Sequence, residues 1–206
     1  PDIYGPGEFD LVGFSVGVVE LERAIDPLRI QEGDILIGIE SSGVHSNGYS
    51  LVRAILKERS ADLNAVVPEA QLRAGEKRTL GEVLLEPTRI YARPIVRLLA
   101  RYRVKKIVSM MSHITGGGMV GNTKRILPEG LALDINWDAW ERPAVYKLIQ
   151  EIGNVPEEDM QATFNLGIGL VTVVSPDAVD AVKAKAEELA LEHLERVQIL
   201  DQAQKY

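Results

Sequence analysis

Two short segments of this chain combine hydroxyl, amide, imidazole and glycine groups in an arrangement suited to holding a phosphate. The first reads SSGVHSNG over residues 41–48, and the second reads SHITGGG over residues 112–118. Each follows an apolar run and precedes a helical pattern, so each is expected to form a strand–loop–helix turn. Glycines let the backbone approach a phosphate closely, and the N–H groups at the start of a helix attract anions. The pair predicts a site for a phosphate-bearing ligand between the two loops.

The candidate binding groups share a place in these loops and an ability to donate hydrogen bonds; they are Ser46, Asn47, Gly48, Thr115, Gly116 and Gly117. His45 and His113 also lie in the loops and are candidates for catalytic proton transfer, because histidine titrates near neutral pH. A structural alternative stays open for each loop. Ser46 or Asn47 could cap a helix, the glycines could serve only a tight turn, and each histidine could be satisfied by neighbouring backbone. Neither loop matches the P-loop or the dinucleotide-binding fingerprint, so spacing alone does not name the ligand.

Two further polar residues lie near glycines outside these loops. Asn165 stands in FNLGIG, residues 164–169, where two glycines in a strand pattern imply close approach of a ligand or of another strand. Asp10 follows the Gly-rich start of the chain and could approach Mg²⁺ or substrate, or could serve only a turn. The chain has no cysteine, and its three histidines are far apart with no carboxylate motif beside them. The sequence therefore predicts no metal site built by this chain alone.

Composition and charge restrict the class of partner. The 206 residues are 46% hydrophobic and 26% charged, which is typical of a globular protein with one core, or one domain plus a remnant of another. The formal net charge is −7, and no long run of Lys or Arg could neutralise the phosphates of a nucleic acid. No apolar run approaches the roughly 20 residues that span a bilayer. We therefore expect a small-molecule ligand, no nucleic acid and no membrane, in a cytoplasmic protein.

Alternating strand and helix patterns must position the two loops. Pro143 and Pro176 suit the first turns of helices, and Gly153 with Asn154 suits a helix end. The alternation predicts an α/β or α+β fold. Residues 9–19 form a strand pattern with no earlier partner in the chain, and residues 59–79 read as an exposed excursion. The predicted strands are 9–19, 34–39, 104–111, 131–135, 166–174 and 196–200, and the predicted helices are 48–57, 94–102, 118–127, 143–152 and 176–191.

Read in order, five segments resemble the phosphoribosylformylglycinamidine cyclo-ligase (aminoimidazole ribonucleotide synthetase) family, in its C-terminal part. They are YGPGEFDLVGF at 4–14, DILIGI at 34–39 followed by SSGVHSNGYSLVR at 41–53, LLEPTRIYARPIV at 84–96, SHITGGGMVGNTKRILPEG at 112–130 and TFNLGIG at 163–169. The resemblance covers nearly residues 1–175. It implies that residues 1–20 end an N-terminal ATP-binding domain and that residues 21–206 form the C-terminal substrate-side domain.

The resemblance also implies an activity. The family closes the imidazole ring: ATP phosphorylates the formyl amide oxygen of formylglycinamidine ribonucleotide, the amidine nitrogen attacks the activated carbon, and phosphate leaves to give aminoimidazole ribonucleotide. This is a step of de novo purine biosynthesis. ATP and Mg²⁺ are bound mainly by the N-terminal half, so this chain is expected to supply the ribonucleotide side and to be inactive alone. Asp10 would lie near the cofactor, and the full-length enzyme would be a homodimer through its N-terminal halves.

Two alternatives of different kinds stay open. A sister enzyme of the same fold group would share the architecture: selenophosphate synthetase, thiamine-monophosphate kinase, the hydrogenase-maturation carbamoyl dehydratase, or formylglycinamidine ribonucleotide synthetase. The segments SSGVHSNGYSLVR and PTRIY together favour the cyclo-ligase. A non-catalytic module that binds a nucleotide or phosphate is the other alternative, and it would need no second half.

Overall fold

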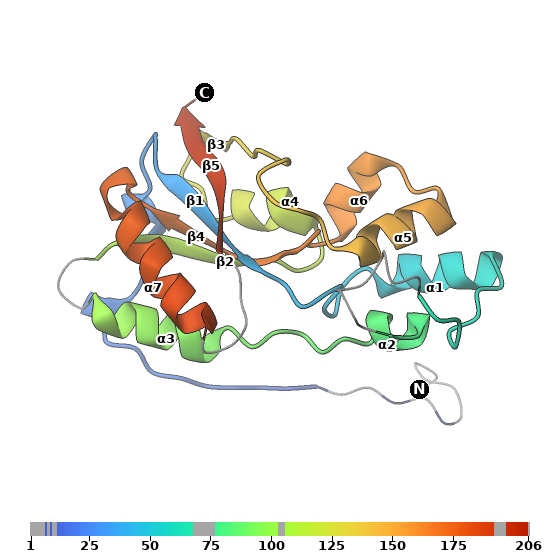
Figure 1. Cartoon of the computed structure of the whole chain (residues 1–206). Coiled ribbons are helices and arrows are strands. Elements are labelled where there is room, and N and C mark those ends of the chain that lie inside the picture. The colour runs from blue at the N-terminus through green and yellow to red at the C-terminus, as the bar shows by residue number, and fades with distance from the viewer. Residues whose placement is uncertain are drawn as a thin grey trace, which may run out of the picture.

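A five-stranded sheet forms the centre of this computed structural model, which describes residues 7, 9, 12–67, 77–102, 106–191 and 197–205 (Figure 1). The strand order is β2-β4-β1-β5-β3, and each of these neighbouring pairs is antiparallel. Of the two fold classes expected from the alternating pattern, the structure therefore has α+β. The strands are β1 Ile35–Glu40, β2 Val108–His113, β3 Leu131–Leu133, β4 Ile168–Val174 and β5 Val197–Lys205.

The helices lie in distinct groups around the sheet. In Figure 1, α3 and α7 lie side by side over one face, whereas α1, α2, α5 and α6 gather beyond one end of it. Helix α4 packs against α6, β2 and β3. The α-helices are α1 Tyr49–Glu58, α2 Leu80–Leu84, α3 Ala92–Arg101, α4 Gly118–Lys124, α5 Ala144–Gly153, α6 Glu157–Thr163 and α7 Val179–Leu191, and the 3-10 helices are η1 Leu21–Arg23, η2 Pro27–Arg29 and η4 Pro176–Ala178.

Strand β1 divides the core between the two faces of the sheet. Leu36 is fully buried and packs with Ile114, Met119 and β4 residues on one face. Its neighbours Ile35 and Ile37 pack with α3 and α7 on the other. Successive side chains of a strand point to opposite faces, so a strand covered on both sides must be apolar at every position. This explains why DILIGI reads as a continuous apolar run rather than an alternating one.

The helical group beyond the sheet has its own core. Tyr146 of α5 and Phe164, just after α6, are almost completely buried, with ring centroids 5.9 Å apart. The predicted end of α5 is confirmed, because Asn154 follows it in the left-handed conformation with φ 48°. Short helices α2 and α6, of 5 and 7 residues, were not predicted, since so few turns carry no readable periodicity. This second core supports the helix that follows the first candidate loop.

The prediction of a strand over residues 9–19 is wrong for its described part. Residues 12–20 run as an unpaired extended segment that forms no strand, and Val12, Phe14 and Val16 are 92%, 91% and 82% exposed. A strand requires partners for its N–H and C=O groups, and an alternating pattern alone does not supply them. The segment passes beneath α3 in Figure 1.

Among the described residues, no helix has both the length and the apolar character needed to cross a bilayer.

Residues 59–79, expected to be an exposed excursion, are partly tied to the helical group. Val67 is 4% exposed and belongs to that core, and Val66 forms an isolated antiparallel bridge with Thr79. Thr79 also forms a reciprocal capping box with Glu82 at the start of α2. The described ends of this excursion are therefore fixed, and they place α2 beside the first loop.

Candidate functional site

The two Gly-rich loops meet at the start of β4. The N–H of Ser41 donates to the carbonyl of Gly167 at 2.8 Å, and the N–H of Ile114 donates to the carbonyl of Gly169 at 2.9 Å. At their tips, Asn47 Oδ1 lies 3.4 Å from the place that a Cβ on Gly116 would occupy. Residues distant in the sequence thus form one surface, as the ligand hypothesis requires. The arrangement depends on FNLGIG, whose alternate residues hold one loop each.

Tyr91 stands between the two loop histidines. Its ring centroid is 6.2 Å from that of His45 and 5.8 Å from that of His113, the latter edge-on. The Tyr91 hydroxyl donates to the carbonyl of Glu40 at 2.9 Å. A Cβ on Gly169 would lie only 2.0 Å from that hydroxyl and 2.8 Å from the His45 ring, so glycine is required there. The two histidines are therefore brought to one place, with an aromatic ring rather than a ligand between them.

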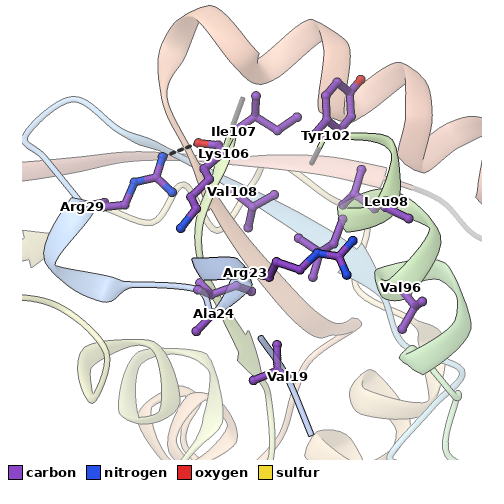
Figure 2. A pocket seen from close by; sticks show the side chains of 13 residues that line it. Val19, Arg23, Ala24, Arg29, Val96, Leu98, Tyr102, Lys106, Ile107 and Val108 are labelled. Carbon is purple, nitrogen blue, oxygen red and sulfur yellow. Dashed lines mark hydrogen bonds between the residues drawn. The ribbon is translucent and has the colours of Figure 1, made fainter. Parts of the chain in front are cut away.

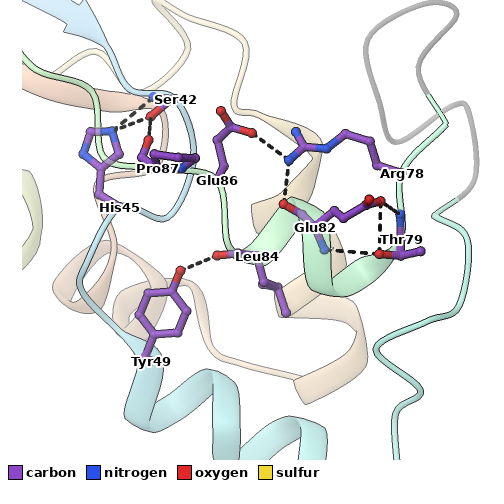
Figure 3. Close-up of polar contacts among 9 residues, drawn as sticks. All are labelled: Ser42, His45, Tyr49, Arg78, Thr79, Glu82, Leu84, Glu86 and Pro87. Carbon is purple, nitrogen blue, oxygen red and sulfur yellow. Dashed lines mark hydrogen bonds and ion pairs between the residues drawn. The ribbon is translucent and has the colours of Figure 1, made fainter. Parts of the chain in front are cut away.

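His45 occupies a dry and unusual position. It is 4% exposed and has φ 59°, in the left-handed region that few non-glycine residues adopt. The backbone N–H of Ser42 points at Nε2 from 3.1 Å (Figure 3). The backbone N–H of Arg89 points at the same atom from 3.5 Å, and such groups can only donate. Nε2 is thus the acceptor, and the proton of the neutral ring lies on Nδ1. Nδ1 is buried and has no partner in the described part of the chain.

Burial is the main cause that lowers the pKa of His45 to about 4, and the nearby charges of His113 and Arg89 contribute to the same shift. A ring held neutral in this way is a poor proton carrier near neutral pH. The environment favours the structural alternative for His45, in which the ring supports the loop. His113 is exposed and stays a candidate for contact with a ligand.

We expect the His45 ring to stay neutral well below pH 6. Unfolding releases it to the ordinary pKa of 6.5, so its contribution to stability is present above about pH 6.5 and is lost as the pH falls toward 4. A ¹H–¹³C NMR titration of the histidine Cε1–H signals, assigned with His45→Gln, measures this directly. A midpoint at or above pH 6 for the His45 signal would contradict the burial argument.

Asn165 lies beneath the first loop rather than on the site surface. It is 4% exposed, and its Oδ1 accepts from Ser41 Oγ at 2.8 Å and from the N–H of Gly167 at 2.9 Å. Its Nδ2 donates to the carbonyl of Gly43 at 2.9 Å, and the Tyr146 hydroxyl lies 2.7 Å from both that carbonyl and Oδ1. The amide is therefore engaged by the loop itself. We infer that Asn165 shapes the loop, in place of the direct substrate contact expected from the sequence.

Asn122 organises the second loop from below. Its Nδ2 lies 2.7–3.2 Å from the carbonyl oxygens of Thr115, Gly116 and Gly118, and its Oδ1 accepts from Thr115 Oγ1 at 3.0 Å. These bonds turn the loop carbonyls inward. Gly116 and Gly117 are exposed, and their N–H groups have no hydrogen-bond acceptor among the described residues. The loop thus presents donors outward, which is what an anion needs.

The outer side of the first loop borders an open hollow of about 470 Å³. Ser46 is exposed there, and its Oγ lies 3.0 Å from Thr88 Oγ1. Helix α1 begins after Gly48 without a side-chain cap, so the capping alternative for Ser46 and Asn47 is not what the structure has. Gly48 has φ 81°, and a Cβ there would lie 2.2 Å from the Phe164 ring. Packing therefore explains Gly48. The hollow is lined by His45, Ser46, Tyr49, Arg53, Leu85, Glu86, Pro87 and Thr88.

Several residues of the site were not predicted individually, although the PTRIY segment contains them. Thr88 borders the hollow, and Arg89 Nη1 donates to the carbonyl of Glu40 at 2.9 Å and lies 3.8 Å from the Glu40 carboxylate. Tyr91 separates the histidines. The pattern of residues around Thr88, Arg89 and Tyr91 is typical of any loop that leads into a helix. The signal for their role was that PTRIY and SSGVHSNG together resemble the cyclo-ligase family. Figure 3 shows the neighbouring ion pair of Glu86 with Arg78 at 2.6 Å.

Asp10, the candidate cofactor ligand, lies outside the described residues. Within the described ranges, no group of three or more His, Asp or Glu side chains is placed to hold a metal ion. The loops therefore offer hydroxyl, amide and backbone N–H donors, which suit a phosphate rather than a divalent cation.

Comparison with known proteins gives consistent matches. A family model described as "AIR synthase related protein, C-terminal domain" matches residues 31–197. Phosphoribosylformylglycinamidine cyclo-ligase of Symbiobacterium thermophilum is 45% identical over 195 residues, which cover 93% of this chain and 53% of the relative. The cyclo-ligase of Sorangium cellulosum is 48% identical over 188 residues, covering 91% of this chain and 52% of the relative. The chain thus spans about half the length of these curated relatives.

One solved structure supports the fold. Thiamine-monophosphate kinase from Stenotrophomonas maltophilia K279a superposes with a TM-score of 0.53 and 16% sequence identity, over 89% of this chain and 51% of that one. At this identity the likeness concerns the fold alone. It agrees with the α+β architecture described above.

Proposed function

Because the chain belongs to the AIR synthase related family, whose C-terminal domain it matches, we propose that it is the substrate-side half of a phosphoribosylformylglycinamidine cyclo-ligase. The whole protein would close the imidazole ring of aminoimidazole ribonucleotide at the expense of ATP. The observation that carries the proposal is the meeting of the two loops, with Asn47 Oδ1 3.4 Å from the Cβ position of Gly116. A ligand lying across that contact would touch both.

In this proposal the second loop holds the ribonucleotide phosphate. The outward N–H groups of Gly116 and Gly117 would bind its oxygens, and the exposed Ser46 hydroxyl and the Asn47 amide would bind from the first loop. Thr115 contributes through its bond to Asn122, which fixes the loop, rather than through a free hydroxyl. Holding the substrate in this way restricts the formyl and amidine groups to one orientation, which is the main catalytic contribution that binding can make.

The reaction balances without any group from this chain entering the product. The γ-phosphoryl of ATP passes to the formyl oxygen and leaves ADP. The amidine nitrogen then forms a bond to the formyl carbon, the carbon–oxygen bond breaks, and phosphate departs with the oxygen. As the ring forms, the formamide N–H and the amidine N–H each give up a proton. Among the described residues, no group of three or more His, Asp or Glu side chains could hold Mg²⁺. We propose that ATP and Mg²⁺ are bound by the preceding half of the protein.

We further propose that residues 1–20 are the end of that preceding ATP-binding domain and that residues 21–206 form the substrate-side domain. The exposed apolar side chains of residues 12–19 support this, since they alternate as in a strand but lack a partner in the described chain. Pairing with the proposed preceding domain would restore the strand expected from the sequence. The same proposal includes a homodimer formed through the preceding halves, in the cytoplasm.

The decisive test uses the complete protein, in which this chain follows its preceding half. With formylglycinamidine ribonucleotide and ATP, we expect equal amounts of ADP and aminoimidazole ribonucleotide, measured by coupled ADP release and by chromatography of the product. Thiamine monophosphate or selenide in place of the ribonucleotide should give no ADP above background. Turnover with either of those alone would assign the protein to a sister enzyme.

Gly116→Ala tests the site itself. A Cβ there would meet only Asn47 Oδ1, at 3.4 Å, which is ordinary contact, so the fold should be unchanged. The added methyl would project into the proposed ligand position. We expect the affinity for formylglycinamidine ribonucleotide, measured by calorimetry, to fall about tenfold, or ~1.4 kcal/mol.

Gly121→Ala is the matched control, since its Cβ would meet nothing within 4 Å. It should bind as the parent does. Equal affinity of the Gly116→Ala variant and the parent would place the ligand elsewhere. Tight binding of phosphate compounds by the chain alone, with no turnover in the complete protein, would favour the non-catalytic module.

A further inference from the structure

A second hollow, of about 320 Å³, lies away from the two loops (Figure 2). It opens between η1, η2, the second half of α3 and the start of β2. Val108, the first residue of β2, lines it, whereas His113, the last residue of β2, borders the loops. The two places are thus separated by about 16 Å along the strand. The cyclo-ligase reaction proposed above uses none of these residues.

The floor of this hollow is aliphatic and already formed. Leu98, Ile107 and Val108 line it and are 3%, 5% and 4% exposed, because they also belong to the core under α7. Tyr102 forms part of the wall, and its hydroxyl donates to the carbonyl of Ala181 at 3.1 Å. That bond fixes the ring against α7. A flat or branched apolar group would find a preformed surface here.

The rim of the same hollow is cationic. Arg23, Arg29 and Lys106 line it, and none of the described carboxylates does, although the chain as a whole has a net charge of −7. In Figure 2, Arg29 and Lys106 lie side by side, and the Arg29 guanidinium donates to the carbonyl of Lys106. A guanidinium carries five N–H donors, so this bond leaves other donors of Arg29 available to a ligand. A gathering of cations against the overall charge points to an anionic partner.

Nearby carboxylates compensate these cations only in part. Arg23 pairs with Glu20 at 3.3 Å, but the two side chains are 44% and 74% exposed, so the pair is weak and easily exchanged. Burial raises the pKa of the Asp34 carboxyl, and the positive charge of Arg29 partly offsets this. Lys106 is exposed, and no carboxylate of the described residues pairs with its ammonium group. The rim therefore retains positive charge for a ligand.

We propose that this hollow binds a small anion with an aromatic body, such as an aryl carboxylate or an aryl phosphate. The ring would lie on Leu98, Ile107 and Val108, and the anionic group would lie between Arg29 and Lys106, with Arg23 completing the rim. Neither part suffices alone: the aliphatic floor supplies affinity for the ring, and the cations select the charge. This inference is independent of the function proposed for the loops.

The test is methyl NMR of the isotope-labelled chain, titrated with 2-naphthoate, 2-naphthyl phosphate, neutral 2-naphthamide and inorganic phosphate. We expect the methyl signals of Leu98, Ile107 and Val108 to shift with both aryl anions. The neutral amide and inorganic phosphate should each bind at least tenfold more weakly. The ratio of naphthoate to naphthyl phosphate affinity tells which anionic group the rim prefers.

Variants locate the site. Lys106→Gln removes a rim charge, and Val96→Glu places a carboxylate at the rim; both parent side chains are exposed, so folding should be unaffected. Each substitution should lower the affinity of the chain for the aryl anions at least fivefold. Lys124→Gln, which removes an exposed lysine of α4 outside the hollow, is the matched control and should change nothing.

Three results would overturn the proposal. Equal binding of the amide and the anions would remove the role of the charges, and equal binding of inorganic phosphate would remove the role of the floor. Shifts confined to the methyls of Val12, Val16 and Val18 would indicate adsorption to the exposed extended segment instead. The titration is then repeated on the complete protein, where loss of binding would show that the hollow is an interface between parts of the protein.

Discussion

Replacing Gly118 with alanine is expected to lower the free energy of unfolding by about 3–5 kcal/mol. Gly118 has φ 64°, a conformation that costs an L-residue about 1–2 kcal/mol. A Cβ there would also lie 1.8 Å from the backbone carbonyl oxygen of Gln161 and 3.3 Å from that of Phe164. Backbone atoms cannot rotate away as a side chain can, so α4 and α6 must separate. Urea unfolding followed by far-UV circular dichroism measures the change.

Two neighbouring glycines serve as controls for this prediction. Gly117 has φ 99°, but the nearest heavy atoms to its Cβ position are 3.8 Å away, in ordinary contact, so Gly117→Ala should cost only the backbone strain, about 1–2 kcal/mol. Gly121 lies inside α4 with open space around it, and Gly121→Ala should be neutral or stabilising by up to about 1 kcal/mol. If Gly118→Ala and Gly117→Ala were equally destabilising, the close contact between α4 and α6 would not be present in solution.

Replacing Asn165 with alanine is expected to cost a similar amount, about 3–5 kcal/mol, for a different reason. The side chain is buried and joins Ser41, Gly43 and Gly167 through hydrogen bonds of 2.8–2.9 Å. Alanine would leave the Ser41 hydroxyl and the Gly167 N–H without their partner, while the Gly43 carbonyl would keep only its bond from the Tyr146 hydroxyl. Each unsatisfied buried group costs about 1–3 kcal/mol unless water enters. Because the bonds hold the first loop, the signals of residues 41–47 in an ¹H–¹⁵N NMR spectrum should change as well.

Two control variants distinguish the loss of this buried hydrogen-bond network from the loss of an asparagine side chain in general. Tyr146→Phe removes one hydroxyl from the same cluster and should cost about 1–2 kcal/mol. Asn64→Ala removes an exposed asparagine whose bonds within the described ranges go to Asp62, and it should cost less than about 1 kcal/mol. A cost for Asn165→Ala no larger than that for Asn64→Ala would mean that water satisfies the buried groups.

Much of the fold could be predicted from local patterns in the sequence. The strand over residues 34–39, the end of α5 at Asn154 and the helix after Pro176 follow from apolar runs and from the preferences of Asn and Pro. The position of the two Gly-rich loops was predictable for the same reason. Local patterns do not show which strands pair with one another. They indicated a strand at residues 9–19, whereas the described part of that segment has no partner and is not one.

The roles of individual site residues were harder to predict because they depend on burial. His45 and His113 belong to similar sequence segments, yet His45 is buried and neutral within its loop, whereas His113 is exposed at the end of β2. Asn165 resembled a ligand contact in the sequence, but its side chain bonds Ser41 and Gly43 of the first loop, together with Gly167 and Tyr146. Tyr91 carried no signal of its own. In each case the deciding factor is a contact between residues far apart in the chain, which spacing does not reveal.

The attachment of both loops to Gly167 and Gly169 has a thermodynamic consequence. Because one short stretch of backbone anchors them, fixing either loop reduces the conformational entropy that the other still has to lose. A ligand fragment that engages one loop should therefore make the second easier to engage. A ribonucleotide that touches both would gain more than the sum of its phosphate and formylglycinamidine fragments measured separately. Cooperativity of this kind requires no shift in the average positions of the atoms, only a narrower distribution about them.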